Sequence, residues 1–118
     1  MTPLADPAYL VGLGGALGAF LRTLVGELVT PDAYPASTLV VNVVGSFCLA
    51  ALTFAGAGDD VVLLLGTGAC GSFTTFSSFA VETVRLWEAD ERARAVVHAG
   101  ANLGGAGFAI ALAWLLVG

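Results

Sequence analysis

The chain of 118 residues contains no lysine, and its four arginines are outnumbered by nine acidic residues. The net charge of −5 leaves no basic surface for nucleic acid, so nucleic acid is not expected as a partner. Most acidic residues fall around the predicted connections, namely Asp32, Asp59, Asp60, Glu82, Glu88, Asp90 and Glu91. An acid-rich surface without lysine also fits a high-salt medium, where ions screen self-repulsion. Only 11% of the residues are charged, whereas a soluble domain carries about a quarter, so an ordinary soluble protein is excluded.

Cysteine and histidine are scarce as well, with two cysteines and one histidine in the chain. Cys48 and Cys70 both lie within apolar stretches and far from any histidine. Two buried thiols are therefore the preferred interpretation over a metal site. The sequence also lacks a Walker loop, zinc-ligand spacing, paired carboxylates and a nucleophile constellation. We therefore expect no enzyme.

Apolar residues dominate instead, at 58% of the chain, with a mean hydropathy of +0.92. Four apolar stretches cover residues 8–29, 36–57, 60–87 and 94–117. Each reaches the roughly 20 residues that a membrane-spanning helix needs. The connections between them, near 30–35, 58–60 and 88–93, leave no room for a soluble domain. The sequence predicts an all-α, multi-pass protein of the cell membrane, in which residues 1–118 form a single four-helix domain.

The third stretch is interrupted by residues 71–79, which read Gly-Ser-Phe-Thr-Thr-Phe-Ser-Ser-Phe. Glycine followed by consecutive threonines predicts a helix broken near residues 71–75. A break at membrane depth is tolerated only where protein or water surrounds it, and the carbonyls it frees can coordinate a cation. Beyond the break, Phe76 and Phe79 are three residues apart and face the same way. This segment is the predicted working part of the chain.

Polar side chains form stripes on two other stretches. Thr38, Asn42 and Ser46 recur every four residues on the second, and His98 and Asn102 do so on the fourth. The amide of Asn42 offers two donors near the middle of the membrane. It either binds an anion or joins two helices. A hydrogen bond between membrane helices contributes about 1 kcal/mol or less to stability. His98 is interpreted as a hydrogen-bonded structural residue.

Glycine pairs on the first and fourth stretches have the spacing of closely packed helices. They are Gly14 with Gly18 and Gly100 with Gly104. Arg22 follows Gly18 on the same face, well inside the first stretch. It either extends its guanidinium to the headgroups or places a cation at the mouth of an anion pathway.

Three motifs in order, at residues 14–22, 38–47 and 71–79, resemble those of the fluoride channel family, Fluc or CrcB. They read Gly-Gly-Ala-Leu-Gly-Ala-Phe-Leu-Arg, Thr-Leu-Val-Val-Asn-Val-Val-Gly-Ser-Phe and the interrupted segment given above. The resemblance covers nearly the whole chain, as far as Asn102. It implies a passive fluoride-selective channel that exports cytoplasmic fluoride, built as an antiparallel dual-topology dimer with two pores at the subunit interface.

The resemblance also implies roles for individual residues. The pore or anion-binding set is Phe76, Phe79, Asn42, Ser77, Ser78, Thr38, Arg22 and Asn102. Asn102 departs from the family pattern, because the fourth span usually supplies hydroxyls and here Ala106 follows it. The backbone carbonyls of Gly71 and Thr74 would hold a structural Na⁺ at the dimer centre.

The physical chemistry of fluoride agrees with these assignments. The ion is small and strongly hydrated, so a dry pore must replace its water shell with donors. Hydroxyl groups and the Asn42 amide can do so. Phenylalanine edges carry the positive end of the ring quadrupole and contact an anion without trapping it.

The arginines are biased toward one side of the membrane. Arg85, Arg92 and Arg94 surround the third connection, which the positive-inside rule places in the cytoplasm. A fixed orientation would require an oppositely oriented, homologous partner chain. A homodimer is nevertheless the preferred interpretation, with the heterodimer as its alternative.

Two other functions remain as alternatives. A small proton-coupled multidrug-type transporter needs a carboxylate near the middle of the first span. Glycines and Leu17 occupy that region, and Glu27 lies too near its end. The other alternative is a non-conducting scaffold or partner subunit of a heterodimeric channel, whose polar stripes only pack helices.

Overall fold

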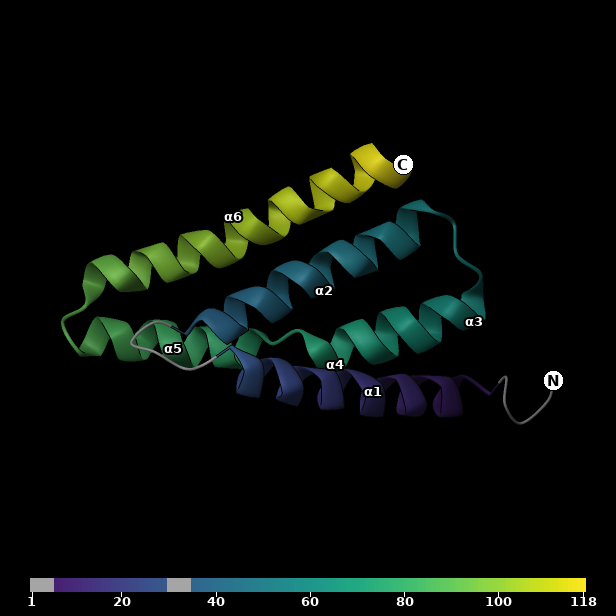
Figure 1. The fold of residues 1–118 in the computed structure, drawn as a ribbon, viewed down its shortest axis with the longest axis horizontal. Coiled ribbons are helices and arrows are strands. Elements are labelled where there is room, and N and C mark those ends of the chain that lie inside the picture. Colours follow the sequence, from purple (N-terminus) through teal and green to yellow (C-terminus); the bar gives the residue numbers. More distant parts are fainter. Residues whose placement is uncertain (1–5, 30–34) are drawn as a thin grey trace.

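The computed structural model describes residues 6–29 and 35–118, and all regular structure within them is helical. Residues 1–5 of the predicted domain and residues 30–34 of the first predicted connection lie outside this part. The elements are α1 (Pro7–Leu28), α2 (Ala36–Phe54), α3 (Asp59–Val61), η2 (Val62–Cys70), α4 (Gly71–Phe73), α5 (Phe76–Glu88) and α6 (Arg92–Val117). Figure 1 shows α1, α2, the run from α3 to α5, and α6 as long rods, each antiparallel to the next along the chain, and α1 begins toward the same end of the molecule at which α6 ends.

Four helical segments are long and apolar enough to cross a membrane: α1, α2, the run Asp59–Glu88, and α6. The predicted number and order of spans are therefore confirmed. The second span ends at Phe54 rather than at residue 57. The helix ends there because the turn that follows places Gly56 at a φ of +71°, a conformation that glycine adopts without steric cost.

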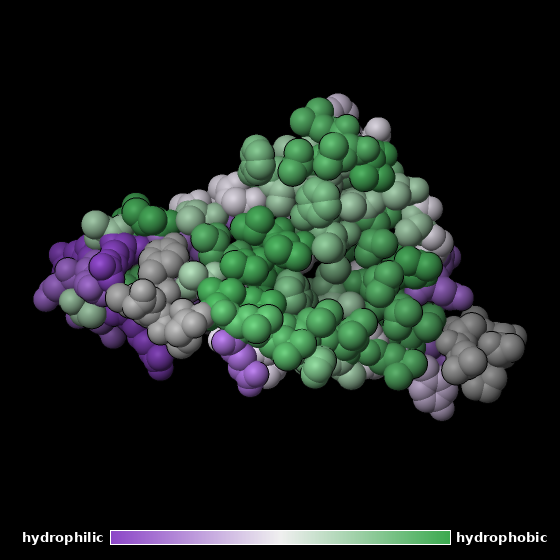
Figure 2. Space-filling model, in the orientation of Figure 1, coloured by the Kyte–Doolittle hydropathy of each residue, from purple (hydrophilic) through white to green (hydrophobic). Residues whose placement is uncertain are grey.

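The bundle buries little apolar side-chain volume. The buried apolar residues within the described part are Val41, Ala50, Cys70, Leu86, Ala95, Ala109 and Ala113. Large apolar side chains instead cover the outside, and Figure 2 shows them over the middle of the molecule, with hydrophilic side chains gathered where α5 and α6 meet. This is the surface expected of a protein surrounded by lipid.

Glycines let α1 lie against η2. A Cβ at Gly14 would collide with the carbonyl of Leu64, and one at Gly18 with the carbonyl of Ala69. From the other side, a Cβ on Gly68 would come within 2.9 Å of Gly14 Cα. The predicted close packing at Gly14 and Gly18 is confirmed.

The second glycine pair behaves differently. A Cβ at Gly100 or Gly104 would meet nothing within 4 Å, whereas one at Gly105 would come within 2.8 Å of Val43 on α2. The prediction that Gly100 and Gly104 pack helices is therefore wrong within one chain. Helix α6 packs through the next glycine along.

Replacing Gly14 with alanine should separate α1 from η2 and lower stability by about 1–3 kcal/mol, because a methyl group has no room there. Thermal melting of the purified protein in detergent measures the loss. Gly12→Ala is the matched control, since the space around Gly12 is open. Equal melting temperatures for the two variants would contradict the expectation.

Candidate anion pathway and cation site

The third span leaves helical geometry at two consecutive threonines. Thr74 has φ −80° and ψ 161°, and Thr75 has φ −150° and ψ 116°, both extended. The carbonyl of Cys70 closes the preceding helix by accepting from the N–H of Thr74 at 3.1 Å and from its hydroxyl at 3.0 Å. The Thr75 hydroxyl starts α5 by accepting from the N–H of Ser78 at 3.1 Å. The predicted break near 71–75 is confirmed.

The helix ahead of the break is also irregular. Residues Val62–Cys70 form a π-helix, a rare geometry that occurs frequently at functional sites. The break that follows lies against α2, whose Asn42 contacts Thr75.

Asn42 holds the extended backbone in place. Its Oδ1 accepts from the Thr75 N–H at 2.8 Å, and its Nδ2 donates to the Thr75 carbonyl at 3.1 Å. The same Nδ2 donates to Asn102 Oδ1 at 2.9 Å. Both hydrogens of the Asn42 amide are thus used within the chain. In this state Asn42 positions the break rather than offering donors to an anion.

These contacts release two carbonyls from the helical hydrogen-bond pattern. In a continuous helix, the carbonyl of Gly71 would accept from the N–H of Thr75, and that of Thr74 from the N–H of Ser78. Those N–H groups go instead to Asn42 Oδ1 and to Thr75 Oγ1. Both residues predicted to hold Na⁺ are thus among those whose carbonyls lose their helical donors at the break. A hard cation prefers such oxygen ligands, so these carbonyl oxygens fit Na⁺.

A hollow of about 290 Å³ opens beside the break. Its lining includes Asn42, Ser46, Gly71, Thr74, Thr75, Phe76, Phe79, Asn102 and Ala106. The Phe76 and Phe79 rings lie 5.8 Å apart between centroids with their planes at 57°. Phe76 is 78% exposed, so one chain presents this ring to its surroundings instead of enclosing it.

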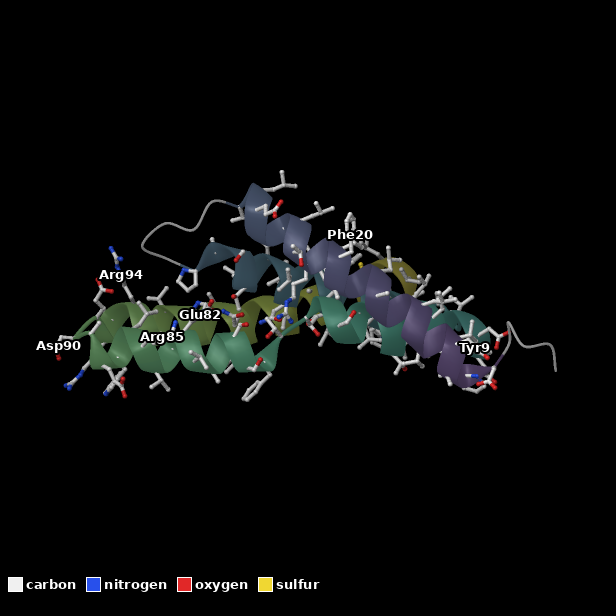
Figure 3. The ribbon with its side chains drawn as sticks, turned by 90° about the horizontal axis from the view of Figure 1, so that it is seen from below. Tyr9, Phe20, Glu82, Arg85, Asp90 and Arg94 are labelled. Carbon is white, nitrogen blue, oxygen red and sulfur yellow. The ribbon has the colours of Figure 1, made fainter. Side chains whose placement is uncertain are left out.

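A second hollow of about 240 Å³ lies further along α5, lined by Ser77, Ser78, Val81, Glu82 and Arg85. Thr38 is buried on α2 and donates its hydroxyl to Glu82 Oε2 at 3.0 Å. Thr38 thus contacts the carboxylate of Glu82, and Ser77 and Ser78 line the same hollow as Glu82. Figure 3 labels Glu82 and Arg85 on α5.

Glu82 was not among the predicted site residues, because it was counted with the acidic residues of the connections. That interpretation is wrong: Glu82 lies inside α5 and its side chain is partly buried. Its Oε1 lies 3.3 Å from Nε2 of His98, which is fully buried. Helical spacing was the available signal, since Glu82 follows Phe79 by three residues.

His98 and Asn102 continue this polar network on α6. The Asn102 side-chain amide donates to the His98 carbonyl at 2.9 Å. The His98 ring also lies 5.6 Å from the Phe79 ring between centroids. The polar stripes of α2 and α6 thus meet each other and α5 in the interior of the bundle.

Arg22 is the predicted residue that the structure leaves apart from this network. It is exposed on α1 and lines neither polar hollow. Arg22 therefore keeps both interpretations, as a guanidinium extended to the headgroups or as a cation at the mouth of an anion pathway.

A larger hollow of about 550 Å³ lies among the apolar side chains of α1, α2 and η2, including Leu17, Leu21 and Val44. Both cysteines line it as free thiols. Cys70 is buried, but Cys48 is exposed because it lies on the outward side of α2, so the prediction of two buried thiols is wrong for Cys48.

Four membrane-spanning helices, with polar side chains lining a hollow beside a broken helix, define a multi-pass membrane protein of the channel or transporter class. A family model described as "CrcB-like protein, Camphor Resistance (CrcB)" matches residues 9–115. The chain belongs to the CrcB family, which confirms the resemblance in its sequence.

Curated relatives carry the names of ion channels. Fluoride-specific ion channel FluC 1 of Halobacterium salinarum is 62% identical over 114 residues, which are 97% of this chain and 96% of that protein. FluC 2 of Haloarcula marismortui is 54% identical, over 95% of this chain and 94% of its own length. FluC of Thermotoga maritima is 44% identical over 79% of this chain and 80% of its own.

Proposed function

We propose that this chain forms a passive, fluoride-selective channel that exports cytoplasmic fluoride. The observation that carries the proposal is the hollow beside the break, in which Phe76 and Phe79 lie together among polar groups of α2 and α6. The printed names of the relatives support fluoride as the ion.

The lining suits a weakly held, dehydrated anion. Ring edges at Phe76 and Phe79 present partial positive charge without a full cation, and hydroxyls of Ser77 and Ser78 line the hollow that follows. Arginine is absent from the lining of the hollow beside the break, whereas Arg85 and Glu82 line the hollow that follows. A site without a full positive charge holds the ion loosely enough to let it leave, as conduction requires.

A structural Na⁺ would explain the released carbonyls of Gly71 and Thr74. A single chain offers these two oxygens at the break, fewer than a hard cation prefers. A second copy related by a two-fold axis would bring the same pair to the same point. The ion would then tie two chains together at the centre of a dimer.

Exposed features fit a partner chain. Phe76 faces outward, as do Gly100 and Gly104 on α6, where a second helix could approach closely. We propose an antiparallel dual-topology dimer in which each pore forms between Phe76 and Phe79 and the partner's surface. Each chain contributes a single four-helix domain.

The arginine distribution bears on the partner's identity. Arg85 and Arg94 lie at the end where α5 and α6 meet, opposite the end with Tyr9 (Figure 3). The described part of the Tyr9 end carries Asp6, Asp59 and Asp60 and no arginine. The positive-inside rule would place the arginine end in the cytoplasm. A homodimer stays preferred, and a homologous chain of opposite orientation is the alternative.

Purified protein in liposomes should release fluoride rapidly down its gradient and retain chloride. A fluoride electrode measures the release, a chloride electrode provides the selectivity control, and protein-free vesicles correct for leakage. Release should need no proton gradient, which separates a passive channel from a proton-coupled transporter. Equal fluoride and chloride release would contradict the proposal.

The same assay tests the partner. Flux from the chain alone supports the homodimer. If flux arises only on reconstitution with a homologous chain of opposite orientation, the chain is one half of a heterodimeric channel. Absence of fluoride flux under both conditions would overturn the proposed function.

A further inference from the structure

A histidine and a carboxylate meet in the interior of the bundle beside the aromatic pair. His98 Nε2 lies 3.3 Å from Glu82 Oε1, and the other carboxylate oxygen accepts from Thr38 at 3.0 Å. The His98 ring contacts Phe79 at 5.6 Å between centroids. Any change in charge on this pair is therefore felt next to a ring assigned to the anion route.

Few other charges surround the pair. On α5, the neighbouring cation is Arg85, one turn beyond Glu82, and it is exposed. On α6, Arg94 lies one turn before His98 and pairs with Glu91 at 3.7 Å on the exposed surface. Helix α2, the third element at the pair, carries no acidic, basic or histidine side chain. Arg85 lines the same hollow as Glu82 and keeps its positive charge over the pH range considered. A change in local charge with pH therefore comes from His98 and Glu82.

Histidine is the side chain suited to exchanging a proton between about pH 5 and pH 8, and His98 is the only one in the chain. With both groups deprotonated, the pair carries one negative charge. One added proton brings the pair to zero, whether the proton stays on His98 or on Glu82. Acidification therefore removes a negative charge from the side of the anion route.

We infer that His98 is a positioning residue that acts through Glu82, and that the two together make fluoride flux respond to protons. The inference rests on the proposed function. Flux should rise as the pH falls, because the deprotonated pair repels the anion approaching Phe79. Even at the dielectric constant of water, a unit charge about 6 Å from an anion changes its energy enough to change a rate roughly threefold. A rise of this size is the expected effect.

The test is fluoride efflux from liposomes at equal pH on both sides, at about pH 8 and about pH 6, so that no proton gradient drives the ion. Wild-type flux should be about threefold higher at the lower pH. His98→Gln should keep the low alkaline flux at both values. Glu82→Gln should already show the high flux at about pH 8. Glu88→Gln, an exposed carboxylate at the end of α5, should keep the wild-type pH profile.

A second measurement does not depend on flux. Because the chain has a single histidine, isotope-labelled histidine gives one ring signal in the NMR spectrum of the intact protein. That signal should change over the pH interval in which flux changes. Assembly of each variant is checked by its elution from a sizing column.

The outcomes separate the two proposals. Wild-type flux that is equal at both pH values, or a ring signal that does not change, overturns the inference and leaves the channel intact. Absence of fluoride flux at every pH, alone or with a homologous chain, overturns both. A pH response that survives in His98→Gln also overturns the role of this residue.

Discussion

Fluoride efflux should fall about tenfold when Phe76 or Phe79 is replaced by isoleucine. Isoleucine keeps most of the apolar volume but removes the positive ring edge and the contact between the two rings, and an aromatic pair contributes about 0.5–1.5 kcal/mol. A loss at the upper end of that range is about tenfold in rate. Efflux from liposomes containing equal amounts of assembled protein measures the effect.

Phe20→Ile is the matched control for these two variants. The same atoms are removed, but Phe20 lies on α1, is 58% exposed and lines no hollow described above. Its flux should equal that of the wild type. If Phe76→Ile and Phe79→Ile also conduct as the wild type does, the aromatic pair has no part in the pore.

The break and the aromatic pair were predictable because their causes are local. Glycine and threonine disfavour a continuous helix at residues 71–75, and the spacing of Phe76 and Phe79 alone places both rings on one face. The four spans were predictable for the same reason, because the hydropathy and the length of each stretch are properties of that stretch alone.

The carboxylate network was missed because its partners come from three different helices. Thr38, Glu82 and His98 are brought together by the packing of α2, α5 and α6, which no pattern within one helix contains. Composition placed Glu82 with the acidic residues of the connections. Its partly buried position is explained by the contacts that Thr38 and His98 make with its carboxylate.

The role of Asn42 could not be predicted from the sequence for a related reason. An amide at membrane depth offers donors to an anion or to another helix, and sequence gives no preference between them. In the structure its partners are the N–H and carbonyl of Thr75, at 2.8 and 3.1 Å. The residue therefore controls the shape of the third span.

Replacing Asn42 with alanine should consequently remove both stability and flux. The extended backbone at Thr75 would lose its partners on α2, at a cost of about 1–3 kcal/mol for a buried polar group left unsatisfied. The Gly71 carbonyl would regain the Thr75 N–H as a helical donor, so the break could close and the cation ligands would be withdrawn. A lower melting temperature in detergent, and efflux reduced by about tenfold or more, are the expected results.

The control for Asn42 is one helical turn away on the same face. Ser46 lines the same hollow and, within the described residues, takes part in no hydrogen bond with another side chain or with the break. Ser46→Ala should melt as the wild type does.

Added Na⁺ should raise the melting temperature of wild type and Ser46→Ala but not of Asn42→Ala, because ion binding to the folded state stabilises it by mass action. If Asn42→Ala keeps its sodium response and loses only flux, Asn42 acts on the anion directly, and the break is held by the threonines alone.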